Sequence, residues 1–169
     1  MNDELFALSA CLGRLLVAQH KQIAVAESCT GGMVAQTLTE IAGSSAWFDR
    51  GFVTYSNAAK IQMLGVQPQT LEQFGAVSAE TALAMVAGVL SRSDADYGLA
   101  VTGIAGPGGG SAIKPVGTVF IAWAVKNGIK YCEQANFSGD RREIRRQTTR
   151  RALSYWVEVL SVNASCVNV

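Results

Sequence analysis

The chain passes several times from a short apolar strand through a tight loop into a helix, and this alternation restricts it to the α/β class. Residues 22–26 have the pattern of a strand, residues 27–32 form a loop that ends in two glycines, and apolar residues at helical spacing follow from Met33 to Ile41. Similar patterns predict helices over 4–20, 57–64 and 78–90 and strands over 47–55 and 97–102.

The pattern changes after residue 110. Residues 116–125 and 130–137 predict two strands joined at Asn127-Gly128, a strong hairpin signal. Asp140 and Glu143 then have the spacing of a capping box at the start of a long final helix. We therefore expect a single layered α/β/α domain over residues 1–169, with a mixed, mainly parallel sheet plus an antiparallel hairpin.

The amino-acid composition indicates which kinds of partner the protein is expected to bind. Hydrophobic residues make up 49% of the 169 residues, while charged residues reach only 16%, below the roughly 25% usual in soluble domains. A thick buried sheet and a covered subunit interface would both lower the charged share, and we expect a homodimer. The net charge of +1 offers no bulk attraction for nucleic acid or a membrane surface, so neither is expected as a partner.

Histidine and cysteine usage limits the chemistry. His20 is the only histidine and ends a predicted helix, so a general base has to be Lys, Tyr, Asp or Glu. The four cysteines are scattered with no CxxC pair, which suggests neither a metal site nor a disulfide framework. The amino terminus lacks the basic start of a secretory signal and no apolar run reaches membrane-spanning length, so we expect a cytoplasmic protein.

Two loops follow predicted strands, where open α/β sheets bind their ligands. Residues 27–32 present Ser28, Cys29 and Thr30 as candidate nucleophiles at a helix amino terminus, which favours a developing oxyanion. Small polar residues also cap helices, and spacing alone does not separate the two roles. Residues 103–110 contain five glycines, typical either of close backbone approach to a ligand or of a surface loop.

Basic residues supply two further candidates. Tyr55 ends a predicted strand and Lys60 lies one turn into the next helix; Lys60 is either a solvated charge or, when desolvated, a general base for a hydroxyl nucleophile. The final helix carries a run of arginines, which forms either a nucleic-acid surface or an ion-paired face. Arg141 and Arg145 share one helical face near its start, a geometry suited to one phosphate.

Five segments together resemble the C-terminal domain of the competence/damage-inducible protein CinA. They are AESCTGG at 26–32, GFVTYSN at 51–57 with Lys60 beyond it, TGIAGP at 102–107, KPVGT at 114–118 and FSGDR at 137–141. The resemblance spans about residues 5–160, with Gly108 and Ile113 at positions where acidic residues are frequent in the family.

Stand-alone members of this family are nicotinamide-nucleotide amidases. The resemblance implies hydrolysis of the carboxamide of nicotinamide mononucleotide without a metal or other cofactor, and pyridine nucleotide salvage as the context. It implies Ser28 as nucleophile, with Tyr55 and Lys60 as its activators. Residues implied in substrate binding are Thr30, Gly31, Thr102, Gly103, Arg141 and, as the second arginine, Arg145. A non-catalytic nucleotide-binding or regulatory module of the same family is the alternative.

Overall fold

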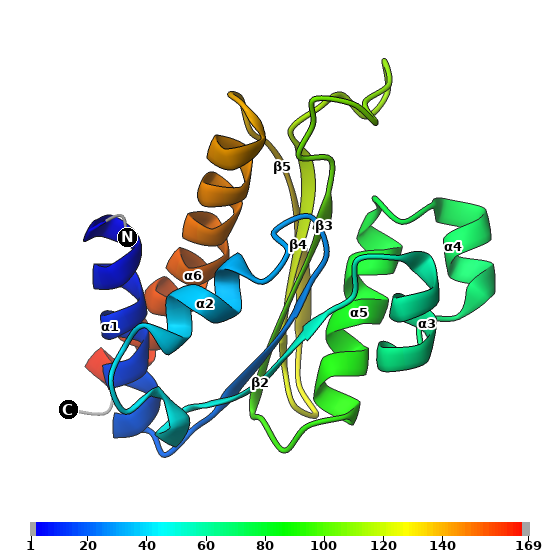
Figure 1. Cartoon of the computed structure of the whole chain (residues 1–169). Coiled ribbons are helices and arrows are strands. Elements are labelled where there is room, and N and C mark those ends of the chain that lie inside the picture. The colour runs from blue at the N-terminus through cyan, green and yellow to red at the C-terminus, as the bar shows by residue number, and fades with distance from the viewer. Residues whose placement is uncertain (1–2, 167–169) are drawn as a thin grey trace.

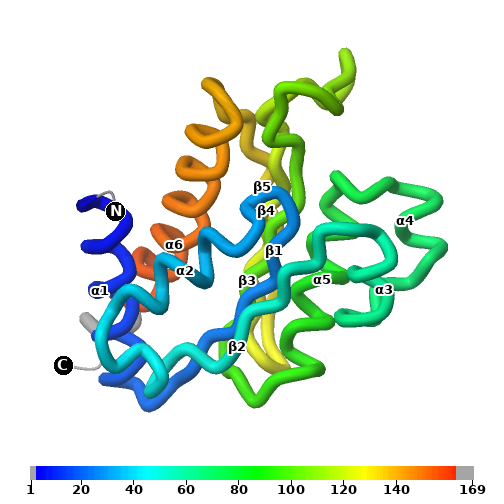
Figure 2. Tube along the Cα trace, viewed as in Figure 1, coloured from blue at the N-terminus to red at the C-terminus, as the bar shows by residue number. Residues whose placement is uncertain are grey.

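The computed structural model describes the backbone of residues 3–166 and the side chains of residues 3–162 (Figures 1 and 2). The strands are β1 (Ile23–Glu27), β2 (Phe48–Val53), β3 (Tyr97–Gly103), β4 (Thr118–Val125) and β5 (Lys130–Asn136). The helices are α1 (Asp3–Ala18), α2 (Met33–Thr39), the short 3-10 helix η1 (Ser44–Ala46), α3 (Asn57–Leu64), α4 (Pro68–Phe74), α5 (Ala79–Ser91) and α6 (Arg141–Cys166).

The five strands form one mixed sheet in the order β2-β1-β3-β4-β5. β1 pairs in parallel with β2 and β3, whereas β3–β4 and β4–β5 are antiparallel. The β4–β5 hairpin turns at Asn127, whose positive φ of 58° suits the turn that the Asn-Gly pair predicts. The expected mixed sheet with an antiparallel hairpin is confirmed.

Helices cover both faces of the sheet. Figure 1 shows α1, α2 and α6 on one face and α3, α4 and α5 on the other. The first face presents large apolar side chains such as Leu99, Ile121 and Trp123, while the strand residues on the second face are mainly alanines. Small side chains let α5 approach the strands closely, because each places little volume between helix and sheet. The three-layer α/β/α arrangement is therefore confirmed.

The connectivity places a crevice at the carboxyl end of β1. The chain passes from β1 to β2 through α2 on one face, then crosses to β3 through α3, α4 and α5 on the other. Neighbouring loops diverge where the helical connections change face, and open α/β sheets bind ligands at such points. Residues 27–32 and 103–110, the two loops singled out in the sequence, both lie at this edge.

The structure adds details that the pattern did not contain. α4 was not anticipated; Pro68 stands at its start, as proline often does at a first helical position. At α6, the Asp140 carboxylate accepts a hydrogen bond from the Glu143 N–H at 2.8 Å, while the Glu143 side chain pairs with Arg146 and not with the Asp140 backbone. The expected capping box is thus half formed.

Gly117 illustrates a required glycine. Its φ is +93°, and a Cβ there would lie 1.8 Å from the Phe137 carbonyl oxygen. No side chain fits this contact, so glycine is needed where β4 begins beside the end of β5.

Within residues 3–166, no helix is both long enough and apolar enough to cross a bilayer.

Candidate active site

A cavity of about 260 Å³ opens at the carboxyl ends of β1 and β3. Its walls include Ser28, Lys60 and Thr102, and the glycine loop and Arg141 close one side. A larger hollow, about 460 Å³, lies between α1, α2 and the start of α6, where Glu143 and Arg146 pair with each other. Of these two cavities, only the smaller one is lined by both a candidate nucleophile, Ser28, and a candidate base, Lys60. The volume of a cavity therefore does not identify the site.

Ser28 is held at the end of β1. Its backbone N–H donates to the Val101 carbonyl at 3.0 Å, which continues the β1–β3 pairing by one residue. The residue is buried yet lines the cavity, and its Oγ lies 3.0 Å from the Lys60 Nζ. The hydroxyl therefore faces the cavity with a basic side chain in hydrogen-bond contact.

Lys60 is fully buried, with 1% of its surface exposed. The turn after β2 brings it back over Ser28, and Ser56 caps α3 by accepting the Ala59 N–H at 3.0 Å. The Lys60 Nζ also lies 2.9 Å from the Thr54 carbonyl oxygen and 3.4 Å from that of Tyr55. Burial lowers the pKa of Lys60 from the ordinary lysine value, because desolvation disfavours the ammonium form.

The three contacts of Lys60 suit a neutral amine. A neutral amine has two N–H donors and one lone pair, and the two carbonyls of Thr54 and Tyr55 can accept the two donors. The lone pair then faces Ser28, whose hydroxyl can donate to it. This is the arrangement needed for a general base acting on a serine hydroxyl.

Cys29 does not compete well as a nucleophile. Burial raises the pKa of its thiol to about 12, and only the thiolate is strongly nucleophilic. Its backbone contributes more: among residues 3–162, the N–H groups of Cys29 and Thr30 donate to no other residue. N–H groups beside the nucleophile that no other residue accepts are available to an oxyanion.

Glu27, the last residue of β1, holds the loop from one side. Its carboxylate is 1% exposed and accepts hydrogen bonds from the N–H groups of Gly32, Val34 and Ala35 at 2.8–3.1 Å. It therefore caps α2 and is turned away from proton transfer at Ser28. Sequence reasoning missed this role, although an acidic residue just before a helix is a recognisable signal.

Arg145 holds the same loop from the other side. Both its Nε, at 3.0 Å, and its Nη2 donate to the Thr30 carbonyl oxygen. Gly31 has a φ of +59°, and a Cβ there would lie 3.3 Å from the Arg145 Nη2. The structure thus brings Thr30, Gly31 and Arg145 together at the loop, and none of the three is part of the cavity wall.

Arg141 reaches the opposite side of the cavity. Its Nη1 donates to the Gly106 carbonyl at 2.8 Å and its Nη2 to the Tyr55 hydroxyl at 2.7 Å. Tyr55 is 60% exposed, and its carbonyl rather than its hydroxyl contacts Lys60. Its hydroxyl is therefore placed beside Arg141 at the cavity mouth and does not lie between Lys60 and Ser28.

Thr102 and Gly103 line the cavity from β3. The Thr102 hydroxyl is buried and donates to the Ala76 carbonyl at 2.7 Å, which ties β3 to the segment before α5. A Cβ on Gly103 would lie 2.8 Å from the Thr118 carbonyl oxygen, so glycine permits β4 to lie close here. The Thr30 hydroxyl, also buried, has no hydrogen-bond partner within the described side chains.

His20 lies far from this chemistry. It precedes β1, while Ser28 follows the other end of that strand, so about 17 Å of extended chain separates them. Among the side chains of residues 3–162, no group of three or more His, Cys, Asp or Glu residues is placed to hold a metal ion. The chemistry of the cavity is that of a hydroxyl, an amine and backbone N–H groups.

Comparison with protein families identifies the family of the chain. The family model of the CinA C-terminal domain matches residues 6–160. The chain belongs to the CinA C-terminal domain family. The expected family resemblance is confirmed over nearly the whole described chain.

Relatives of this CinA-family chain include named enzymes. It is 51% identical over 160 residues to the nicotinamide-nucleotide amidohydrolase PncC of Escherichia coli K12, covering 94% of this chain and 97% of that one. It is 48% identical over 151 residues to PncC of Pseudomonas putida, covering 89% and 94%.

Solved structures of the family have the same fold. The competence/damage inducible protein CihA of Agrobacterium tumefaciens superposes with a TM-score of 0.90 at 49% identity, covering 94% of this chain and 96% of that one. The competence damage-inducible protein A of Klebsiella pneumoniae subsp. pneumoniae MGH 78578 gives 0.89 at 37% identity, covering 93% and 97%.

Proposed function

We propose that this chain is a nicotinamide-nucleotide amidohydrolase, which converts nicotinamide mononucleotide and water to nicotinate mononucleotide and ammonia. The observation that carries the proposal is the 3.0 Å contact between Ser28 Oγ and the buried Lys60 Nζ, in a family whose relatives at about half identity bear this activity as their name. The chain is accordingly a hydrolase of an amide C–N bond, built as a single domain over residues 1–169.

Acylation begins with neutral Lys60. Its Nζ accepts the Ser28 proton while Oγ forms a bond to the carboxamide carbon, whose oxygen becomes an oxyanion. The N–H group of Cys29, which lines the cavity, is the first donor available to that oxygen, and the N–H group of Thr30 follows it on the same loop. The C–N bond then breaks, the leaving amide nitrogen takes the proton from the Lys60 ammonium, and ammonia departs.

Deacylation uses the same groups in reverse. Lys60 accepts a proton from water, the resulting hydroxide attacks the Ser28 ester, and Oγ leaves with the proton that Lys60 returns. The products are nicotinate mononucleotide and free Ser28. Atoms and charges balance without a metal or other cofactor.

Substrate is held by the cavity walls away from Ser28. The Arg141 guanidinium lies at the cavity mouth. It can exchange its hydrogen bonds to Tyr55 and Gly106 for hydrogen bonds to the phosphate of the substrate. Thr102 and Gly103 contact the ligand from β3. Tyr55 assists at the mouth, since its hydroxyl contacts Arg141 and not Lys60.

Ammonia release from nicotinamide mononucleotide by the purified chain, compared with Ser28→Ala, tests the proposal. We expect continuous release by the wild type and none by the variant, while both bind the mononucleotide. Binding without ammonia release by either protein would instead identify a nucleotide-binding or regulatory module.

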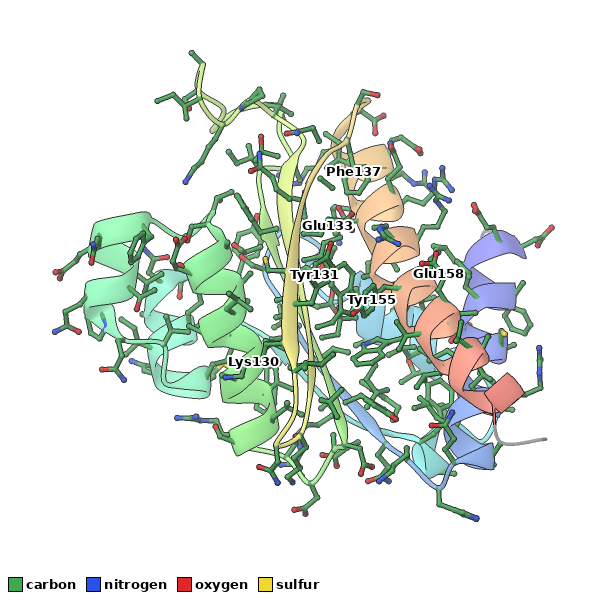
Figure 3. All side chains as sticks on the ribbon, turned by 180° about the vertical axis from the view of Figure 1, so that it is seen from behind. Lys130, Tyr131, Glu133, Phe137, Tyr155 and Glu158 are labelled. Carbon is green, nitrogen blue, oxygen red and sulfur yellow. The ribbon has the colours of Figure 1, made fainter. Side chains whose placement is uncertain are left out.

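We also infer a homodimer. The outer edge of β5 has no strand partner among the described residues, and Tyr131 on it is 45% exposed. Tyr131 stacks on Tyr155 of α6 with ring centroids 5.6 Å apart. Figure 3 shows these two side chains next to each other between β5 and α6, so they add an aromatic surface beside the open edge. Antiparallel pairing of two β5 strands would join the two sheets and cover this surface.

Light scattering tests the assembly. A mass near twice 17.9 kDa at micromolar concentration supports the dimer, and a mass near 17.9 kDa overturns it.

A cytoplasmic location is part of the same proposal, since the substrate belongs to cofactor metabolism and the described cysteines, Cys11, Cys29 and Cys132, are free thiols.

A further inference from the structure

The loop that carries Ser28 lacks the positive potential that a helix amino terminus normally supplies. A helix start attracts a developing anion through its free N–H groups. Here the buried Glu27 carboxylate accepts the N–H groups of Gly32, Val34 and Ala35, so a full negative charge already occupies the start of α2. Apart from the Lys60 ammonium that forms when Ser28 loses its proton, a positive charge on the Ser28 loop has to come from a side chain and not from the start of α2.

Arg145 is in the right place to supply it. Its Nε and Nη2 both donate to the Thr30 carbonyl, and none of the described carboxylates lies within ion-pair distance of it. Arg145 therefore acts on the loop without an ion-pair partner, and its charge opposes that of the Glu27 carboxylate on the same loop. The same charge acts to lower the pKa of the Cys29 thiol, against the larger effect of burial.

Two peptide groups connect Arg145 to the oxyanion donor. The peptide group whose carbonyl belongs to Thr30 carries the Gly31 N–H, which donates to the Ser28 carbonyl at 3.1 Å. The next peptide group, formed by the Ser28 carbonyl, carries the Cys29 N–H, which donates to no other described residue and lies beside the nucleophile. Hydrogen bonds linked in this way polarise one another, and a charged donor at one end strengthens the effect.

We infer that Arg145 is a positioning residue of the amidase reaction: its guanidinium fixes the Ser28 loop and, through the Thr30 and Ser28 peptide groups, strengthens the Cys29 N–H as an oxyanion donor. This inference rests on the proposed function. It assigns Arg145 to the transition state, in place of the substrate-phosphate role that its spacing from Arg141 suggests.

Arg145→Gln tests the inference, with Arg142→Gln as the matched control. Arg142 is an exposed arginine on the same helix, and its side chain has no hydrogen bond or ion pair with any described residue. Removing one direct oxyanion donor lowers kcat about 10²–10³-fold in other enzymes. Because Arg145 acts through intervening peptide groups, we expect kcat to fall about 10- to 100-fold, and Arg145→Lys, which keeps the charge, to recover part of that loss.

Substrate affinity separates positioning from binding. Calorimetric titration of nicotinamide mononucleotide into Ser28→Ala and into the Ser28→Ala/Arg145→Gln double variant should give dissociation constants within about twofold. A large loss of affinity with unchanged kcat would overturn the inference in favour of phosphate binding. Unchanged kcat and affinity would also overturn it.

Folding and the proposed function have separate readouts in this experiment. If Arg145→Gln does not fold, the kcat of Arg145→Lys is compared with that of the wild type instead, because lysine keeps a donor and a charge at the loop. A wild-type kcat in folded Arg145→Lys would show that the two N–H donors of the guanidinium are not needed, and would overturn the inference in that form. A wild type and an Arg142→Gln variant that both release no ammonia would refute the proposed function itself. Active controls with an equally active Arg145→Gln refute only the inference.

Discussion

Replacing Lys60 by methionine should change how stability depends on pH. Lys60 is 1% exposed and burial lowers its pKa, so the folded protein releases this proton at a lower pH than the unfolded chain does. Methionine has a similar length and no titratable group. The variant therefore removes one linked proton with little change in side-chain volume.

The sign and size of the effect follow from proton counting. Between the lowered pKa of folded Lys60 and the ordinary value of 10.5, the unfolded chain binds one proton more than the folded protein. The free energy of unfolding of the wild type therefore rises with pH by about 1.4 kcal/mol per pH unit in that window, relative to Lys60→Met. Below the folded pKa and above 10.5 the difference is constant.

Urea unfolding of both proteins, followed by tryptophan fluorescence from about pH 6 to about pH 11, measures the difference directly. Subtraction cancels the titration of groups that the two proteins share, and Ser28→Ala, which retains the lysine, should keep the rising limb. The lower bend of the curve should coincide with the acid limb of wild-type kcat/KM. A difference that is flat across the range, or that falls with pH, would refute a neutral Lys60 and with it the general base.

Three further outcomes are expected. Ser28→Ala should abolish ammonia release while Cys29→Ala remains active, as a colorimetric ammonia assay will show, because the pKa of the Cys29 thiol is raised to about 12; the reverse result would make cysteine the nucleophile. Tyr55→Phe should lower kcat/KM only about 2- to 10-fold, since it removes one exposed hydrogen bond to Arg141 and no contact with the base; a loss as large as that of Ser28→Ala would restore Tyr55 to proton transfer. Glu27→Gln should lower the free energy of unfolding by about 2–3 kcal/mol in urea titrations, because the buried Val34 N–H and the part-buried N–H groups of Gly32 and Ala35 lose a charged acceptor; unchanged stability would contradict the capping role.

Local signals explain why much of the fold could be predicted. The hairpin depends on Asn127-Gly128, and the strand-loop-helix unit around Ser28 depends on periodicity and adjacent glycines, all within a few residues. α4 carried no such signal: Pro68–Phe74 is seven residues long, mostly polar, and its helical state is stabilised by packing on α5.

The sequence predicts which residues are candidates for the site better than it predicts the contacts that they make. Lys60 was a candidate base from residue type alone, but its burial depends on a turn that folds it over a serine 32 residues earlier. The sequence pattern groups Arg145 with Arg141, because the two share a helical face. Its partner proved to be a backbone carbonyl, and a carbonyl has no signature in the sequence.

The most direct test of the central claim, that Ser28 forms a covalent acyl intermediate, is to turn over nicotinamide mononucleotide in the presence of hydroxylamine. An acyl-enzyme partitions between water and the added nucleophile, so the account predicts that the ratio of hydroxamate to nicotinate mononucleotide rises with hydroxylamine concentration. Ser28→Ala should form neither product. Equal amounts of ammonia and nicotinate mononucleotide at every hydroxylamine concentration, with no hydroxamate, would show that water attacks the amide directly and would contradict the account.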